Sequence, residues 1–209
     1  MDFAGFQKLR ENLPERLKPV FTLGFYTGMR LGEIRNLKWD QVNFHERTIQ
    51  LNTGETKNDE ARIVPLNTET AMMLKILQKR TDSVFVFGNG RPLGQFRKAW
   101  RTACVKSKLG MVTKHEDGAE TYEGLIFHDL RRTGVRHLVC AGVSEQVAMA
   151  VSGHKTRSVL SRYNIASETD LKDAANKLDS YMAAKQIEAD QRKDEIAFGE
   201  KTVKKQAVN

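Results

Sequence analysis

Apolar residues recur at helical spacing along most of the chain, and this pattern predicts a mainly α-helical protein. Proline, glycine and short polar runs separate the helical segments. The predicted helices span Phe3 to Asn12, Glu15 to Tyr26, Leu31 to Leu37, Thr68 to about Lys79, Leu93 to Lys108, Phe127 to Cys140, Ser144 to Val151, Thr156 to Tyr163 and Ser167 to Ala184.

Three short segments show β-type patterning instead. Val42 to Phe44 and Thr48 to Leu51 flank one polar turn, and Arg62 to Pro65 follows a second polar turn that contains Lys57. The predicted fold class is therefore α+β, mainly helical, with a small three-stranded antiparallel sheet. The polar stretch Gly110 to Gly124 is predicted to be a loop.

The C-terminal part of the chain changes in character. Leu171, Leu178 and Met182 share one face of the last predicted helix. Residues 185–209 mix charges of both signs with few apolar residues, which is typical of a flexible tail. We expect one domain over residues 1–184 and a tail over residues 185–209.

Composition narrows the functional classes. A net charge of +8 is compatible with a polyanionic partner such as DNA, although many basic proteins bind no nucleic acid. Cys104 and Cys140 are isolated, which favours a reducing cytoplasm. Neither a signal-peptide pattern nor an apolar run of membrane-spanning length is present, so we expect a cytoplasmic protein without a membrane partner.

Six residues form a set that suits phosphodiester chemistry. Tyrosine is protonated at neutral pH and becomes a nucleophile only where cations stabilise the transferring phosphoryl group and a neighbour accepts the proton. Taken singly, each member also fits a solvated or packed side chain, so the prediction depends on their joint order. The six are Arg30, Lys57, His128, Arg131, His154 and Tyr163.

The segments TGMRLGEIRNLKWDQV, TKNDEARIVPL, HDLRRTGVRHLV and SGHKTRSVLSRYNI resemble those of the tyrosine recombinases, the phage-integrase family. The resemblance covers about residues 3 to 180 and implies the catalytic-domain fold of that family. It implies that Tyr163 attacks a DNA phosphate, which leaves a 3′-phosphotyrosyl bond and a free 5′-hydroxyl. Type IB topoisomerases share this catalytic layout, so a topoisomerase is one alternative, and a catalytically silent DNA-binding module is another.

The resemblance also implies a role for each cation. Arg30 and Arg131 would hold the non-bridging phosphate oxygens, because guanidinium groups match phosphate geometry and stay charged. Lys57 would protonate the leaving 5′-oxygen. His128 would assist proton transfer at the tyrosine oxygen, and His154 would hydrogen-bond a phosphoryl oxygen. The reaction implied requires no metal and no cofactor.

Further polar residues are expected to support the site or the DNA. Glu33 is expected to be a structural partner of the first arginine, and Asp129 either has a comparable role or is solvated. His115, Glu116 and Asp117 fit a polar loop better than a metal site. Either a DNA-facing or a solvated surface fits the basic residues Arg97, Lys98, Arg101, Lys106, Lys108, Arg132 and Arg157.

Two departures from the family pattern bear on partners. Family members usually carry an N-terminal core-binding domain, whereas here the catalytic domain is expected to begin almost at Met1, so we expect a catalytic fragment or a naturally short protein. Ser152 stands before Gly153 and His154, where a larger apolar residue is common. The implied partner is double-stranded DNA, with assembly into a tetramer in which the C-terminal helix docks in trans or folds back in cis. A nucleoid-associated protein of prokaryotic or phage origin is expected.

Overall fold

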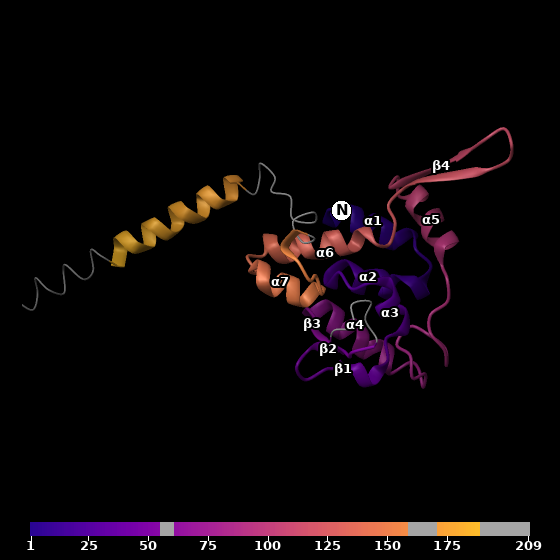
Figure 1. Ribbon diagram of the computed structural model, residues 1–209, viewed down its shortest axis with the longest axis horizontal. Helices are drawn as coiled ribbons and strands as arrows, with labels where there is room; N and C mark the ends of the chain where they lie inside the picture. The colour runs from indigo at the N-terminus through magenta and orange to yellow at the C-terminus, as the bar shows by residue number, and fades with distance from the viewer. Residues whose placement is uncertain (55–60, 159–170, 189–209) are drawn as a thin grey trace, which may run out of the picture. The chain divides into compact units, whose positions relative to one another are not determined.

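The computed structural model describes residues 1–54, 61–158 and 171–188. The chain separates into two compact units, Met1–Asn164 and Ile165–Asn209. The described part of the second unit is a helix over residues 171–188. The first unit contains both sheets and all the labelled helices (Figure 1).

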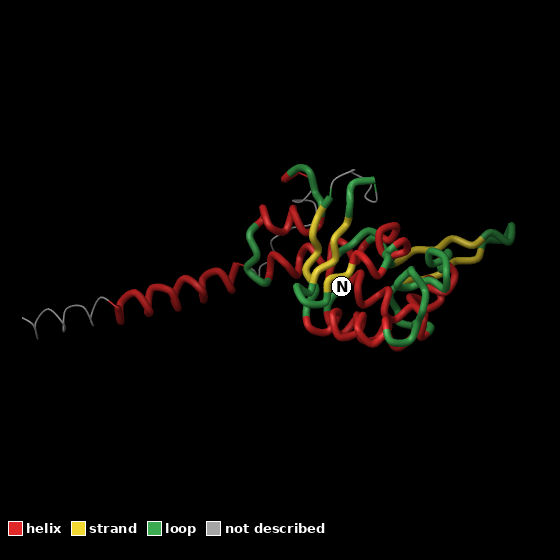
Figure 2. Tube along the Cα trace, turned by 90° about the horizontal axis from the view of Figure 1, so that it is seen from below, coloured by secondary structure: helices red, strands yellow, loops and turns green. Residues whose placement is uncertain are grey.

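The strands of the first unit come in two runs separated by helices, and Figure 2 shows helices lying between the two sheets. In chain order the elements are α1 (Phe3–Asn12), η1 (Glu15–Leu17), α2 (Lys18–Thr27), α3 (Leu31–Asn36), η2 (Trp39–Gln41), β1 (Val42–Asn43), β2 (Thr48–Leu51), β3 (Arg62–Pro65), α4 (Thr68–Gln78), α5 (Arg97–Lys106), β4 (Gly110–Lys114), β5 (Glu120–Gly124), α6 (Asp129–Cys140) and α7 (Glu145–Ser152).

Local sequence signals explain several helix boundaries. Asn67 accepts a hydrogen bond from the Thr70 N–H at 2.9 Å and so caps α4. The prediction of one helix from Glu15 to Tyr26 is wrong, because a 3₁₀ turn precedes α2 and Pro19 occupies the first turn of α2, where its missing N–H costs nothing. The basic helix begins at Arg97 rather than Leu93, since the Leu93 N–H donates to the Arg35 carbonyl at 3.0 Å.

The predicted three-stranded sheet is confirmed, with strand order β1-β2-β3 and both pairings antiparallel. In β3, Val64 is fully buried whereas Ile63 is 60% exposed. Arg62 therefore lies on the inward-facing side of the strand with Val64, because alternate residues point to opposite faces. β3 packs against α7, so the side chain of Arg62 is directed toward the end of that helix.

The prediction of a loop over Gly110–Gly124 is wrong. β4 and β5 pair as an antiparallel hairpin that projects from the helices in both Figure 1 and Figure 2. His115 Nε2 lies 2.7 Å from Thr121 Oγ1, and Asp117 accepts from the Ala119 N–H at 2.9 Å, so these side chains build the turn. The hairpin buries few side chains, which explains why its polar sequence carries no strand pattern. Among the described residues, no group of three or more His, Cys, Asp or Glu side chains could hold a metal ion.

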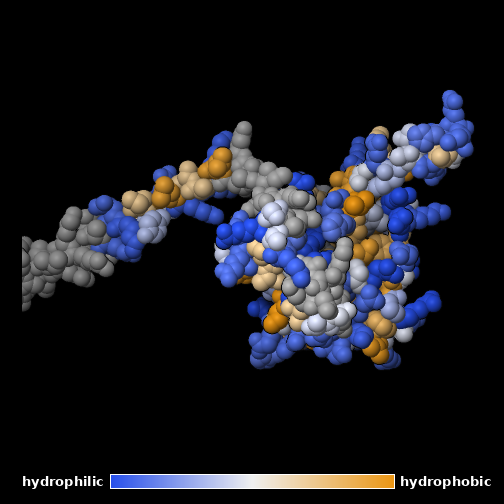
Figure 3. All heavy atoms as spheres, in the orientation of Figure 1, coloured by the Kyte–Doolittle hydropathy of each residue, from blue (hydrophilic) through white to orange (hydrophobic). Residues whose placement is uncertain are grey.

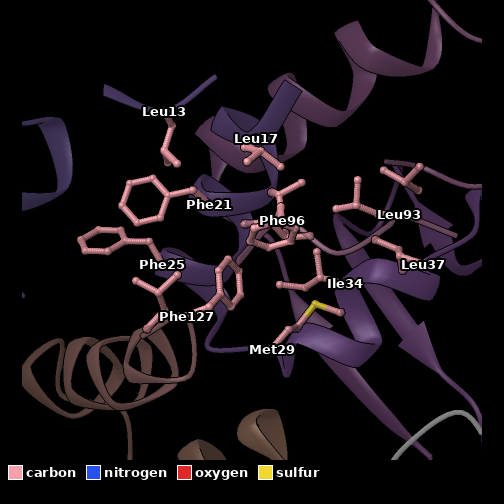
Figure 4. Close-up of a cluster of buried hydrophobic side chains, with 14 of the residues drawn as sticks. Leu13, Leu17, Phe21, Phe25, Met29, Ile34, Leu37, Leu93, Phe96 and Phe127 are labelled. Atoms are coloured by element: carbon pink, nitrogen blue, oxygen red, sulfur yellow. The ribbon is translucent and has the colours of Figure 1, made fainter. Parts of the chain in front are cut away.

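An aromatic core joins α1, α2 and α5 to the start of α6 (Figure 4). A Cβ atom on Gly24 would lie 2.8 Å from Phe127 Cζ, so glycine lets the Phe127 ring pack directly on α2. Because Phe127 immediately precedes His128, this packing positions the start of α6. The buried rings of the core are Phe6, Phe21, Phe25, Phe96, Trp100 and Phe127.

The helix of the second unit extends beyond the predicted end at Ala184. Its last turn contains an ion pair between Lys185 Nζ and Glu188 Oε2 at 2.7 Å, a favourable i,i+3 arrangement. The predicted cap over Ser167–Asp170 and residues 189–209 of the predicted tail lie outside the described residues. No helix in the described ranges is both long and apolar enough to cross a membrane.

Candidate active site

The site forms where α6 packs against the end of α2. α2 ends at Gly28, whose φ of +63° lies in the left-handed region that favours glycine. A Cβ atom on Gly134 of α6 would lie only 2.7 Å from the Gly28 backbone nitrogen. These two glycines therefore allow the α6 backbone to approach the turn that leads into Arg30.

Arg131 of α6 connects three segments of the chain. Its side chain is buried, Nη1 donates to the Gly28 carbonyl at 3.2 Å, and Nε donates to His154 Nε2 at 3.2 Å. Both bonds span more than twenty residues of sequence, so they fix the guanidinium group relative to the α2 turn and the end of α7.

Glu33 binds two arginines at once. Its Oε1 accepts from Arg30 Nη1 at 3.0 Å, and its Oε2 accepts from Arg62 Nη2 at 2.6 Å and from the Arg30 backbone N–H at 2.8 Å. Burial favours the neutral acid, but the hydrogen bonds and charges of Arg62 and Arg30 outweigh it and hold the pKa of Glu33 below its usual value. Glu33 is therefore ionised at neutral pH.

The same arginines hold the turn after α7. Arg30 Nη2 donates to the Gly153 carbonyl at 3.2 Å, and Arg62 Nε donates to the Val151 carbonyl at 3.1 Å. Gly153 has a φ of +69°, and a Cβ atom there would lie 3.1 Å from Arg62 Cδ. This turn, which leads into His154, is thus fixed from both sides by guanidinium groups.

His154 is 8% exposed, and its Nδ1 lies 2.8 Å from Ser152 Oγ. Burial, together with neighbouring positive groups, lowers the pKa of His154 to about 4. The imidazole is therefore neutral at neutral pH. In decreasing order of effect, the positive groups are Arg131, Arg30, Arg62 and His128.

His128 lies at the edge of this cluster. It is the N-cap of α6, and its side chain is exposed to solvent. Asp129 Oδ2 accepts from the Ile126 N–H at 2.8 Å, which fixes the turn that precedes the helix. Because the charge of His128 acts on the pKa of His154, the two imidazoles belong to one electrostatic neighbourhood.

The structure thus brings Arg30, Arg131 and His154 into one hydrogen-bonded cluster, with His128 beside it. Lys57 and Tyr163 lie outside the described residues. Sequence reasoning did not identify Arg62 as a member of the cluster. The segment ARIVPL contains Arg62, but a charged residue in a short strand is normally expected to face solvent. The side chain of Arg62 is buried instead, because β3 packs against α7.

The basic residues expected to face DNA are all exposed, and hydrophilic residues dominate the visible face of the first unit in Figure 3. The Arg101 guanidinium lies 5.0 Å from the centre of the Tyr122 ring, a cation–π contact between α5 and β5. Arg157 Nε lies 3.9 Å from Glu145 Oε2 in an exposed pair. The exposed residues are Arg97, Lys98, Arg101, Lys106, Lys108, Arg132 and Arg157.

Solved structures of similar fold are recombinases and integrases. The XerA recombinase superposes with a TM-score of 0.65 at 20% identity, covering 85% of this chain and 64% of that one. A Tn1549 transposon integrase in complex with transposon right end DNA superposes with a TM-score of 0.63 at 17% identity, covering 85% of this chain and 65% of that one. At these identities the comparison shows the catalytic-domain fold, which confirms the predicted fold class.

Curated relatives of similar sequence are also named as recombinases and integrases. A shufflon-specific DNA recombinase of Escherichia coli is 29% identical over 146 residues, which are 69% of this chain and 33% of the relative. The integrase of Salmonella phage P22 is 27% identical over 188 residues, 83% of this chain and 45% of the relative. A tyrosine recombinase of Thermosipho africanus is 28% identical over 168 residues, 78% of this chain and 54% of the relative. The chain therefore spans between a third and about half the length of these relatives.

The family comparison covers most of the sequence. The model of the phage integrase family matches residues 4–169, a range that contains the whole hydrogen-bonded cluster described above as well as Lys57 and Tyr163. The resemblance stated from the four sequence segments is confirmed, and the chain belongs to the phage integrase family.

Proposed function

We propose that this chain is the catalytic domain of a site-specific DNA recombinase or integrase that cuts and rejoins DNA through Tyr163. The observation that carries the proposal is the cluster in which Arg30 and Arg62 share the carboxylate of Glu33, while Arg131 is hydrogen-bonded to a neutral His154 beside them. Three guanidinium groups against one carboxylate leave an excess of positive charge. Such a preorganised cationic site stabilises a pentavalent phosphoryl group better than water does.

The proposed reaction is a transesterification without external energy. The Tyr163 oxygen attacks the phosphorus and loses its proton to His128, while the bond from phosphorus to the 5′-oxygen breaks. Lys57 gives a proton to that 5′-oxygen. Arg30 and Arg131 bind the non-bridging oxygens and stabilise the negative charge that accumulates on them in the transition state. Attack by the 5′-hydroxyl of another strand reverses the steps and rejoins the DNA.

The environment of two other tyrosines supports the choice of Tyr163. The Tyr26 hydroxyl donates to Glu69 Oε2 at 2.6 Å, and burial and this carboxylate raise the pKa of Tyr26 to about 12. The Tyr122 hydroxyl donates to the Leu125 carbonyl at 2.8 Å, and burial raises the pKa of Tyr122 strongly. Both phenols are thus poor nucleophiles. The chain has four tyrosines, so Tyr181 is left as the alternative to Tyr163.

The proposed partner is double-stranded DNA. The net charge of +8 and the exposed cations of α5 support it, and a lambda integrase dimer of the same fold is solved bound to a core site. We further propose assembly into a tetramer on DNA through the helix at residues 171–188. Its Leu171, Leu178 and Met182 recur at helical spacing, which suits docking on an apolar surface of a neighbouring subunit.

A suicide substrate tests this function. It is a nicked duplex, taken from the DNA that flanks the gene, whose short 5′ fragment diffuses away after cleavage. The parent protein is expected to form a covalent adduct on a denaturing gel, Tyr163→Phe is expected to bind the duplex without forming one, and Tyr181→Phe serves as the matched control that retains it. An adduct in Tyr163→Phe would refute the tyrosine assignment. A parent protein that forms no adduct on its own site, even when joined to an N-terminal DNA-binding half, would refute the enzymatic function.

A further inference from the structure

A chain of hydrogen bonds passes through both nitrogens of His154. Ser152 Oγ lies 2.6 Å from the Ala148 carbonyl and 2.8 Å from His154 Nδ1, and Arg131 Nε lies 3.2 Å from His154 Nε2. Ser152 and Arg131 are almost completely buried. The contacts therefore form in a region that water does not reach easily, where each donor needs an acceptor.

The chemistry of the two partners determines the protonation state of each nitrogen. A guanidinium Nε carries hydrogen and cannot accept, so Nε2 of His154 must present its lone pair to Arg131. The neutral imidazole then carries its hydrogen on Nδ1, so the Ser152 oxygen accepts from Nδ1–H while the one hydroxyl hydrogen of Ser152 is donated to the Ala148 carbonyl. Both ends of the chain thus favour the same tautomer, the Ser152 end by offering an acceptor to Nδ1–H and the Arg131 end by offering a donor to Nε2.

We propose that Ser152 is a positioning residue that holds His154 in the Nδ1–H tautomer and so directs the lone pair of Nε2 to Arg131. Ser152 acts through His154 and does not itself contact the reacting groups. Ser152, on the last turn of α7, offers Nδ1–H an acceptor oxygen, which an apolar residue at this position cannot provide.

This tautomer has a consequence for phosphate binding, which rests on the proposed function. With Nδ1–H held by Ser152, Nε2 can donate to a phosphoryl oxygen only after it gains a proton from solvent and gives up its bond from Arg131 Nε, which makes His154 an imidazolium. The positive groups that face it are Arg131 of α6, Arg30 before α3 and Arg62 of β3, and the titratable His128 lies in the same neighbourhood. They oppose protonation in the free protein, and the negative charge of a bound phosphate group offsets them. Anion binding at this cluster is therefore coupled to the uptake of one proton.

Nitrogen-15 NMR of the histidine side chains tests the proposal on the intact chain, because the two tautomers of imidazole differ in which nitrogen carries hydrogen. The His154 signals are assigned by their loss in His154→Gln. The expected result at pH 7 is a proton on Nδ1 and a lone pair on Nε2. Ser152→Ala, which removes a single oxygen atom, is expected to populate the Nε2–H form, whereas Ser144→Ala at the other end of α7 leaves the spectrum unchanged.

Three outcomes would overturn the inference. A parent protein with its proton on Nε2 would contradict the geometry, even if Ser152→Ala did not fold. A Ser152→Ala variant that kept the Nδ1–H form alone would show that Ser152 does not hold the tautomer. Inorganic phosphate that bound to the cluster while His154 stayed neutral would overturn the proton uptake. The parent and Ser152→Ala spectra need no DNA cleavage. The tautomer assignment can therefore be refuted while the recombinase function is supported, and the recombinase function can be refuted while the tautomer assignment is supported.

Discussion

At the scale of the residue, the charge of the site depends on how Glu33 is shared. Its carboxylate accepts from Arg30 and from Arg62, and both it and Arg62 are nearly inaccessible to water. If Arg62 were absent, the carboxylate would neutralise Arg30 alone, and Arg30 would attract a phosphate less strongly. With Arg62, the group of Arg30, Arg62 and Glu33 carries a net positive charge instead of none.

Arg62→Met tests this account of charge sharing. It removes the charge but keeps much of the side-chain length, and we expect single-turnover adduct formation at saturating DNA to fall by about tenfold or more, a cost of at least about 1.4 kcal/mol. Combining Glu33→Gln with Arg62→Met also removes the negative charge that Arg62 offsets. The double variant should therefore form adduct faster than Arg62→Met alone. A coupling of about 0.5–3 kcal/mol is expected for contacting residues. Strictly additive losses would show that Arg62 is only a packing element.

The histidines make stability depend on pH. The unfolded chain binds a proton at His154 near the ordinary pKa of about 6.5, whereas the folded chain does so only near pH 4. Between these values the unfolded state binds more protons, so stability falls as the pH falls. His137, whose pKa is lowered mainly by burial, acts in the same direction.

We therefore expect the free energy of unfolding to decrease from pH 7 to pH 4 less steeply in His154→Gln than in the parent. Urea unfolding at each pH measures this slope, and His45→Gln, at an exposed side chain, is the control. An unchanged slope in His154→Gln would mean that the imidazole is not buried in its neutral form.

At the scale of the element, the approach of α6 to α2 places Arg131 beside the turn that leads to Arg30. The approach depends on glycine at two facing positions: Gly134, where the backbone of the α2 turn leaves no room for a Cβ, and Gly28, whose φ of +63° favours glycine. The close packing of α6 on α2 therefore also sets the position of Arg131 relative to Arg30.

Gly134→Ala is expected to separate the two helices. Its Cβ would lie 2.7 Å from the Gly28 nitrogen, and overpacking of this kind costs about 1–3 kcal/mol. In a protein of this size that lowers Tm by about 2–4 °C for each kcal/mol. Gly32→Ala in α3 is the matched control, since a Cβ there meets nothing within 4 Å and alanine favours the helix. Equal Tm values for the two variants in a thermal melt would contradict the close contact.

The sequence predicted the elements whose limits are set locally. The bounds of α1, β2 and β3 match the prediction, because caps, turn residues and alternation act within a few positions. The β4–β5 hairpin and the burial of Arg62 were missed because both depend on contacts between segments far apart in the chain. The order of the six candidate site residues was readable from the sequence, whereas the bonds that connect Arg30, Arg131 and His154 required the fold.

At the scale of the whole molecule, the excess of positive charge should make DNA binding strongly dependent on salt. The logarithm of the binding constant falls with the logarithm of salt concentration by about 0.9 for each phosphate that is neutralised. The exposed cations of α5 are the proposed source of several such contacts.

Lys98→Ala is expected to weaken binding to all DNA sequences to a similar extent and to reduce the salt slope by about 1. Lys75→Ala, at another exposed lysine, on α4, is the matched control and should leave the slope unchanged. Fluorescence anisotropy with a labelled duplex over a salt series measures both. Equal slopes for the two variants would exclude Lys98 from the DNA interface.

The most direct test of the central claim is to identify the atom to which the DNA becomes attached. Adduct from the suicide substrate is digested with trypsin and nuclease, and the modified peptide is sequenced by mass spectrometry. The account predicts a nucleotide joined through its 3′-phosphate to the oxygen of Tyr163. Attachment to Tyr26, Tyr122 or Tyr181, or through a 5′-phosphate, would contradict it.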